Sequence, residues 1–175
     1  MNINRSRRFV ICILFLATIS CTKKAEEPPK EETKTSDGRL APRLKNIGDL
    51  QAPISTKSKD AQAYFNQGLT LVYGFNHAEA LRSFKEVARL DPDCAMAYWG
   101  QALALAPNIN DPAIGPDREQ QGFDAMTEST KRKAQSSPRE QALIDALAAR
   151  FSGAKDRNRQ ALNQAYADAM ANALR

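Results

Sequence analysis

The sequence predicts an all-α fold in which about three antiparallel helix pairs stack as a solenoid, preceded by a cleaved leader and a flexible tether. From Ala61 onward, apolar residues recur at three- and four-residue spacing, as on one face of a helix. Alanine is abundant, whereas valine and isoleucine are sparse after the first 20 residues, which favours helix over strand. Glycine and proline are confined mainly to a few clusters.

Residues 1–20 have the pattern of a secretory signal peptide. Three basic residues, Arg5, Arg7 and Arg8, precede an apolar run from Phe9 to Ala17. A helix that crosses a bilayer needs about 20 apolar residues, so this run is too short to span one. Its length suits the hydrophobic part of a signal peptide, which is removed from the mature protein.

The end of this leader, Thr18-Ile19-Ser20-Cys21, resembles a bacterial lipobox, although Thr18 stands where leucine is usual. The resemblance implies that the Cys21 thiol receives a diacylglycerol and that the new amine is acylated after cleavage. Two or three acyl chains would anchor the protein firmly, because each buried methylene contributes ~0.8 kcal/mol. Thr22 replaces the aspartate that marks inner-membrane retention, so the outer membrane is favoured and the side it faces stays open. The alternative is an ordinary signal peptide with an incidental cysteine.

Residues 21–57 are expected to form a flexible tether. The stretch is charged, contains prolines and has almost no large apolar residue before Leu40. Such a segment cannot bury enough surface to offset the loss of chain entropy on folding. The helical domain is therefore predicted to occupy residues 58–175.

The first predicted pair has a helix from Ala61, a turn at residues 74–77, and a second helix that ends at Leu90-Asp91-Pro92. Its 34-residue span, 61–94, resembles a tetratricopeptide repeat (TPR), a family of stacked helix pairs. The residues that carry this resemblance are Tyr64, Gly68, Ala80, Phe84, Val87 and Pro92. The family pattern implies that Gly68 and Ala80 let the two helices approach closely while Tyr64 and Phe84 fill the surrounding space. Pro92 would fix the turn into the next pair.

The second pair starts at Ala95, where Tyr98 and Ala102 repeat Tyr64 and Gly68 at the same 34-residue offset. A long loop at residues 107–116 replaces the tight turn, and a helix is predicted from about Asp117 to Gln135. The third pair opens with Ser137-Pro138-Arg139-Glu140, the pattern of a helix-capping box. The last helix is predicted from about Asp156, with Leu162, Tyr166 and Met170 on its apolar side.

No residue pattern points to an enzyme, a metal site or a cofactor. His77 is the single histidine and lies at a predicted turn, so a cluster of histidine ligands is excluded and a structural role is favoured. Turn chemistry accounts for Asp91 and Asp93, and Cys94 is expected to be a packed thiol and not a reactive one. The net charge of +5 falls to about +2 without the three leader arginines, so nucleic acid is not an expected partner.

The resemblance implies that the first helix of each pair lines a concave face, which would expose an apolar stripe for a protein partner. Further helices covering this face are the alternative. In the loop, two asparagines could form a polar pocket for a small ligand, or could satisfy loop backbone groups. The candidate partner-binding residues are Phe65, Leu69, Trp99, Leu103, Asn108 and Asn110.

The expected function is a membrane-anchored scaffold for protein contacts in the bacterial envelope. The alternative is an accessory module that binds a small ligand or an enzyme complex through the 107–116 loop. The last helix keeps apolar residues close to Arg175 without an evident stop signal. The array is therefore expected to be incomplete, and the domain to be marginally stable alone or to form a homodimer through this helix.

Overall fold

The computed structural model describes residues 34–153 and 158–173. Within these ranges the chain forms helices and irregular segments, with no β-strand. The helices are α1 (Lys59–Tyr73), α2 (His77–Leu90), α3 (Ala95–Leu105), α4 (Pro116–Arg132), the 3₁₀-helix η1 (Lys133–Gln135), α5 (Pro138–Ala148) and α6 (Arg159–Ala173). The predicted leader and Cys21 lie outside the described residues.

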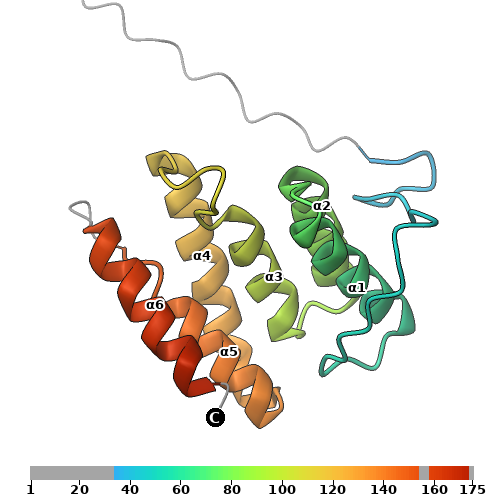
Figure 1. Cartoon of the computed structure of the whole chain (residues 1–175). Helices are drawn as coiled ribbons and strands as arrows, with labels where there is room; N and C mark the ends of the chain where they lie inside the picture. Colours follow the sequence, from blue (N-terminus) through green and yellow to red (C-terminus); the bar gives the residue numbers. More distant parts are fainter. Residues whose placement is uncertain (1–33, 154–157, 174–175) are drawn as a thin grey trace, which may run out of the picture. The chain divides into compact units, whose positions relative to one another are not determined.

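The helices pack in consecutive pairs, as the sequence predicts. α1 packs on α2, α3 on α4, and α5 on α6, while α2–α3 and α4–α5 contacts join neighbouring pairs. The first helices of the pairs also meet, because α3 contacts both α1 and α5. Figure 1 shows the helices in chain order, from α1 and α2 in green to α5 and α6 in orange and red. The all-α, paired-helix prediction is confirmed.

Side-chain caps set where three of these helices begin. Ser58 accepts a hydrogen bond from the Ala61 amide, 3.1 Å away, so α1 starts two residues before the predicted position. Asn76 caps α2 in the same way. The predicted capping box is confirmed at α5, where Ser137 and Glu140 each accept a hydrogen bond from the other's backbone amide.

The core of the first two pairs is built around the Phe84 ring, which is fully buried. Gly68 faces this ring as predicted: a Cβ added there would lie 2.7 Å from Phe84 Cε1. Gly100 of α3 approaches the same ring from the next pair, a contact that the sequence analysis did not identify. Gly122 of α4 has the same relation to Phe151, which follows α5. Glycine therefore brings helix backbones against a phenylalanine ring at three positions.

The prediction that residues 34–57 are a flexible tether is wrong. This part of the chain has no regular secondary structure, but residues 39–55, which we call the strap, pack against α1 and α2. Ala41 is fully buried, and Leu44, Ala52 and Ile54 pack against the core. Residues 21–33, the rest of the predicted tether, lie outside the described residues.

None of the helices within residues 34–153 and 158–173 combines the length and the apolar character that a membrane-spanning helix requires.

Candidate functional site

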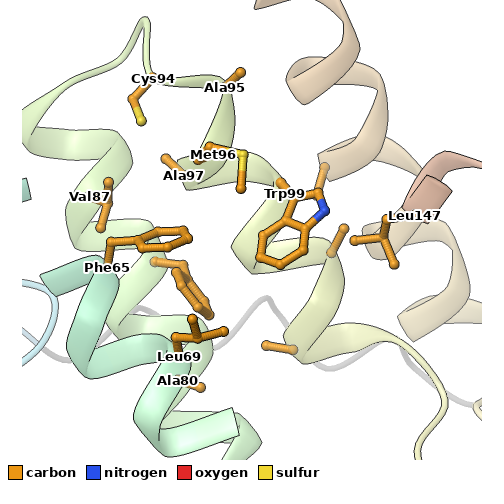
Figure 2. Packing of buried hydrophobic residues seen from close by; sticks show 14 of the residues in the cluster. Phe65, Leu69, Ala80, Val87, Cys94, Ala95, Met96, Ala97, Trp99 and Leu147 are labelled. Atoms are coloured by element: carbon orange, nitrogen blue, oxygen red, sulfur yellow. The ribbon is translucent and has the colours of Figure 1, made fainter. Parts of the chain in front are cut away.

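The predicted partner-binding stripe is buried. Phe65 is 2% exposed, Leu69 and Trp99 are each 8% exposed, and Leu103 is half-buried. Figure 2 shows Phe65 of α1 and Trp99 of α3 within one packed cluster, with Leu147 of α5 beside the indole. The prediction of an exposed stripe is therefore wrong, and these residues belong to the core.

The physical reason is that α5 covers this face of α3. The Trp99 indole nitrogen donates a hydrogen bond to the Leu143 carbonyl, 3.1 Å away, which satisfies the one polar atom of that side chain. The Phe65 ring lies 5.5 Å from Phe84 and 6.3 Å from Trp99, measured between ring centroids. The alternative raised from the sequence, that further helices cover the face, is confirmed.

The 107–116 loop uses Asn108 to hold its own backbone. The Asn108 side-chain oxygen accepts hydrogen bonds from the Asn110 and Asp111 amides, at 2.9 and 3.1 Å. Asn110 is exposed. Asn108 therefore satisfies loop backbone groups, which is one of the two alternatives raised from the sequence. Its side-chain oxygen is not free to bind a ligand.

Arg118 of α4 fixes this loop to the end of α3. Its guanidinium donates to the Leu105 carbonyl at 2.9 Å and to the Ala106 carbonyl at 3.1 Å, and it forms an ion pair with Asp111. Both carbonyls lie at the C-terminal end of α3, where helix carbonyls lack an intrahelical partner. One side chain therefore caps a helix and anchors the long loop.

The residues predicted to pack the repeats divide into two groups. Ala80, Phe84 and Ala102 are fully buried between helices, as expected. Tyr98 is half-buried at the turn: its hydroxyl donates to the Pro92 carbonyl at 3.1 Å, and the Arg132 guanidinium lies 4.3 Å from its ring centroid. Tyr98 and Pro92 therefore join the α2–α3 turn to the end of α4.

Tyr64 faces the strap. Its ring is 2% exposed, and its hydroxyl donates a hydrogen bond to the Ala41 carbonyl at 3.1 Å. The guanidinium of Arg43 lies 4.9 Å from the ring centroid, a distance at which a cation is attracted to the ring face. Besides its predicted role in filling the space around the α1–α2 contact, Tyr64 therefore also binds the strap.

Side-chain amides on α1 hold the strap by its main chain. Gln67 accepts a hydrogen bond from the Leu44 amide and donates one to the Pro42 carbonyl, both at 2.9 Å. Gln62 makes the same pair of bonds further along, accepting from the Ile54 amide at 2.9 Å and donating to the Ala52 carbonyl at 2.8 Å. Each glutamine thus pairs with one donor and one acceptor of an extended chain.

Two buried carboxylates hold the ends of the strap. Glu86 of α2 is fully buried and accepts from the Leu40 amide at 2.9 Å, and Glu140 of α5 accepts from the Ser55 amide at 2.6 Å. Burial acts to raise the pKa of both carboxyls. Hydrogen bonds outweigh it, from Arg89 and Leu40 at Glu86 and from Ser55 and Ser137 at Glu140, so both pKa values lie below the usual value. Both groups are therefore ionised near neutral pH.

Three strongly exposed apolar side chains lie on two connections between helices, two at the α1–α2 turn and one in the 107–116 loop. Tyr73 is 69% exposed, Phe75 is 56% exposed and Ile109 is 85% exposed. Phe75 has a φ of +59°, in the left-handed region where a bulky residue is an outlier. We call Tyr73, Phe75 and Ile109 the end cluster.

His77, the first residue of α2, contacts the Phe75 ring of the end cluster. Its ring lies edge-on to Phe75, with 6.2 Å between centroids. Both ring nitrogens are buried without a hydrogen-bond partner. Burial lowers the pKa of His77, the positive charge of Arg118 lowers it further, and Asp111 acts in the opposite direction. The charges of Arg118 and Asp111 therefore lie near enough to His77 to affect its pKa.

A polar cleft of about 700 Å³ lies where residues 55–58, the α2–α3 turn and η1 meet. Asp91, Asp93 and Cys94 line it together with serine and threonine side chains. Cys94 is only 3% exposed, and burial raises the pKa of its thiol to about 11. The thiol is therefore protonated near neutral pH, consistent with a packed and unreactive cysteine.

Residues 34–153 and 158–173 contain no group of three or more histidine, cysteine, aspartate or glutamate residues placed to hold a metal ion. Comparison of the chain with known protein families, with curated proteins and with solved structures finds no match.

Sequence reasoning missed the strap site and the end cluster. One signal for the strap was present, because three amide side chains, Gln62, Asn66 and Gln67, interrupt the apolar spacing of α1. Gln67 is 4% exposed, and a buried amide needs hydrogen-bond partners from another segment. For the end cluster, the phenylalanine in Gly74-Phe75-Asn76 was visible, but its left-handed backbone was not.

Proposed function

We propose that this protein is a lipid-anchored scaffold for protein–protein contacts in the bacterial envelope, built on a TPR-like solenoid and without catalytic activity of its own. The end cluster carries the proposal. The residues that dominate binding energy in protein interfaces are enriched in aromatic side chains, tyrosine among them. A backbone outlier at such a residue is a reason to suspect function, because the strained conformation needs support from its surroundings.

The surroundings of Phe75 supply such support. The Asn76 amide donates to the Leu71 carbonyl at 2.9 Å, and the Phe75 amide donates to the Val72 carbonyl at 3.1 Å. This is the Schellman pattern at the end of α1, in which the left-handed position is usually glycine. Here glycine stands one residue earlier, as Gly74, and the left-handed position carries an exposed phenylalanine. Local stability alone would favour the opposite order.

A site-specific photo-cross-link tests the scaffold. A photoreactive phenylalanine analogue at position 75 of the full chain in its native cells should give a protein adduct of defined mass. The same analogue at Thr127, an exposed position on α4, is the control. Adding Tyr73→Ser and Ile109→Ser should reduce the adduct at least tenfold. Equal labelling from both positions, or none from position 75, would reject the end cluster as a partner surface.

The lipid anchor is a separate part of the proposal and has its own test. Mass spectrometry of the membrane-bound protein should find an acylated peptide that begins at Cys21, and density fractionation should place it in the outer membrane. Cys21→Ser should release the protein or leave it unprocessed. An unmodified Cys21 in the mature protein would reject lipid anchoring while leaving the scaffold proposal intact.

Self-association through α6 is a further part of the proposal. Within Arg159–Ala173, α6 has no fully buried residue, and Leu162 and Met170 are half-exposed. Sedimentation of the full chain in detergent should show a dimer that Met170→Glu dissociates. A monomer over the whole concentration range would reject association through this helix.

A further inference from the structure

Much of the strap is bound through groups that every polypeptide possesses, although Arg43 and Gln51 also make side-chain contacts with Tyr64 and Asn66. Gln62 and Gln67 contact only main-chain amides and carbonyls of the strap, and the Asn66 side-chain oxygen accepts from the Ala52 amide at 3.1 Å. Main-chain hydrogen bonds of this kind give affinity for an extended peptide regardless of most of its side chains. The α1 face therefore has the chemistry of a peptide site, and the strap occupies it.

The strap's own apolar contact with the helices is incomplete. Ala41 is fully buried, but Leu44 and Ile54 are only half-buried, and Arg43 and Gln51 are exposed. An open cavity of about 360 Å³ is lined by residues of both the strap and α1, among them Arg43, Gln51 and Asn66. Segments with few buried apolar contacts can open locally at a free energy below that of global unfolding. We therefore expect a local opening in which the strap leaves α1 while the helix pairs remain folded.

We infer that the face of α1 formed by Gln62, Tyr64, Asn66 and Gln67 is a binding site for an extended basic segment of a protein partner, and that the strap is an internal occupant which this segment replaces. The inference rests on the proposed function, since it requires a protein partner. It adds the α1 face as a second partner-binding surface beside the end cluster. Access to the α1 face would then depend on displacement of the strap.

The strap's side chains define what the site accepts. Ala41 is 0% exposed, so the partner needs a small residue at that position. Pro42 contributes only its carbonyl, so proline is tolerated there, whereas the residue matching Leu44 must keep its amide hydrogen. The Arg43 cation over Tyr64 favours a basic residue two positions after the small one.

The test opens the strap without altering α1. In the full chain, Leu44→Pro with Ile54→Pro removes two of the backbone amides that donate hydrogen bonds to glutamine side chains of α1. Leu44→Ala with Ile54→Ala is the matched control, because it removes the same side chains and keeps both amides. The probe is a fluorescent peptide with the sequence of residues 38–56, followed by anisotropy. The proline variant should bind it at least tenfold more tightly than the alanine control and the unaltered chain do.

Two further measurements identify what is recognised. The same peptide with N-methyl groups at the positions of Leu44 and Ile54 should lose at least tenfold in affinity. Gln62→Leu with Gln67→Leu, added to the proline variant, should have a similar effect. Peptide binding that is equal across all variants, or no binding to a proline variant with unchanged helical circular dichroism, overturns the inference.

Hydrogen exchange decides the case in which the proline variant fails to fold. In the unaltered chain, the amides of Leu44, Ala52 and Ile54 should exchange through local opening, at rates insensitive to low denaturant. If they exchange only with global unfolding, the strap is a fixed structural element and the inference is overturned.

Three outcomes separate this site from other assignments. A dimer that forms only when straps are exchanged between copies would assign the site to a second copy of this chain and overturn the partner version. A Phe75 cross-link with no peptide binding to the proline variant would reject the α1 site and leave the scaffold proposal standing. Peptide binding without a Phe75 cross-link would reject the end cluster alone.

Discussion

The backbone of Gly100 in α3 lies against the ring of Phe84 in α2 so closely that no larger residue fits between them. Phe84 is fully buried and is also approached by Gly68 of α1. The packing of α1, α2 and α3 around this ring therefore depends on two glycines that present no side chain.

The first prediction concerns these glycines. Gly100→Ala and Gly68→Leu should each destabilise the fold by about 1–3 kcal/mol, because the added atoms would overlap the fully buried Phe84 ring. Thermal or denaturant unfolding measures the effect. Gly115→Ala is the control, since nothing lies within 4 Å of a Cβ there and its φ is −69°. An unchanged melting temperature for Gly100→Ala would mean that this helix packing is incorrect.

The second prediction distinguishes core from surface aromatics. Trp99→Ala should destabilise the fold by about 3–5 kcal/mol, because it removes a buried ring from between α1 and α5. Tyr73→Ala should change stability by less than about 0.5 kcal/mol, since surface substitutions away from special features do little. Urea unfolding followed by circular dichroism measures both. Similar values for the two variants would contradict the assignment of Trp99 to the core.

The third prediction concerns acid and the strap. The pKa values of Glu86 and Glu140 are lowered in the folded protein, so their stabilising effect is complete above the unfolded value of about 4.5. It is lost as the pH falls from there through the folded pKa values. NMR spectra of the Leu40 and Ser55 amides should therefore show the strap ends released before the helices unfold.

Glu140→Gln is the matched variant for this titration. Glutamine keeps an acceptor for the capping box but has no proton to gain in this range. The Ser55 amide should then lose its pH dependence while the Leu40 amide keeps it. Strap release that coincides with global unfolding at every pH would contradict the prediction.

The fourth prediction concerns Cys94. With its pKa raised to about 11 by burial, the thiol should react with iodoacetamide at pH 8 on the order of a hundredfold more slowly than in the unfolded chain. Alkylation followed by mass spectrometry, with and without denaturant, measures the ratio. Equal rates in the two states would show that the thiol is accessible from the polar cleft.

The helix pairs were predictable because they depend on local signals. The capping box at Ser137 and Glu140 and the stop at Pro92 act within a few residues, and the spacing of apolar residues identifies the buried face of each helix. Gly68 was found because it falls within a repeat pattern. Gly100 and Gly122 do not fall within that pattern, and their packing role is apparent only once the structure places a phenylalanine ring from another segment beside them.

The functional surfaces were harder to predict for a related reason. Trp99 lies on the face expected to be concave, but whether that face is open depends on α5. This helix starts at Pro138 and is separated from α3 in the sequence by the 107–116 loop and α4. The strap was predicted to be disordered because its composition is polar, yet its partners are side chains of α1, α2 and α5. Composition measures what a segment can bury and does not register donors and acceptors supplied by distant helices.

Arg118 has a consequence for how this domain tolerates change. One guanidinium caps the C-terminal carbonyls of α3 and pairs with Asp111. The part of the loop between these contacts therefore does not need a particular length. Ile109 and Asn110 protrude between the fixed points at Asn108 and Asp111. The tip of this loop is therefore a place where residues can be exchanged or inserted without disturbing the helices.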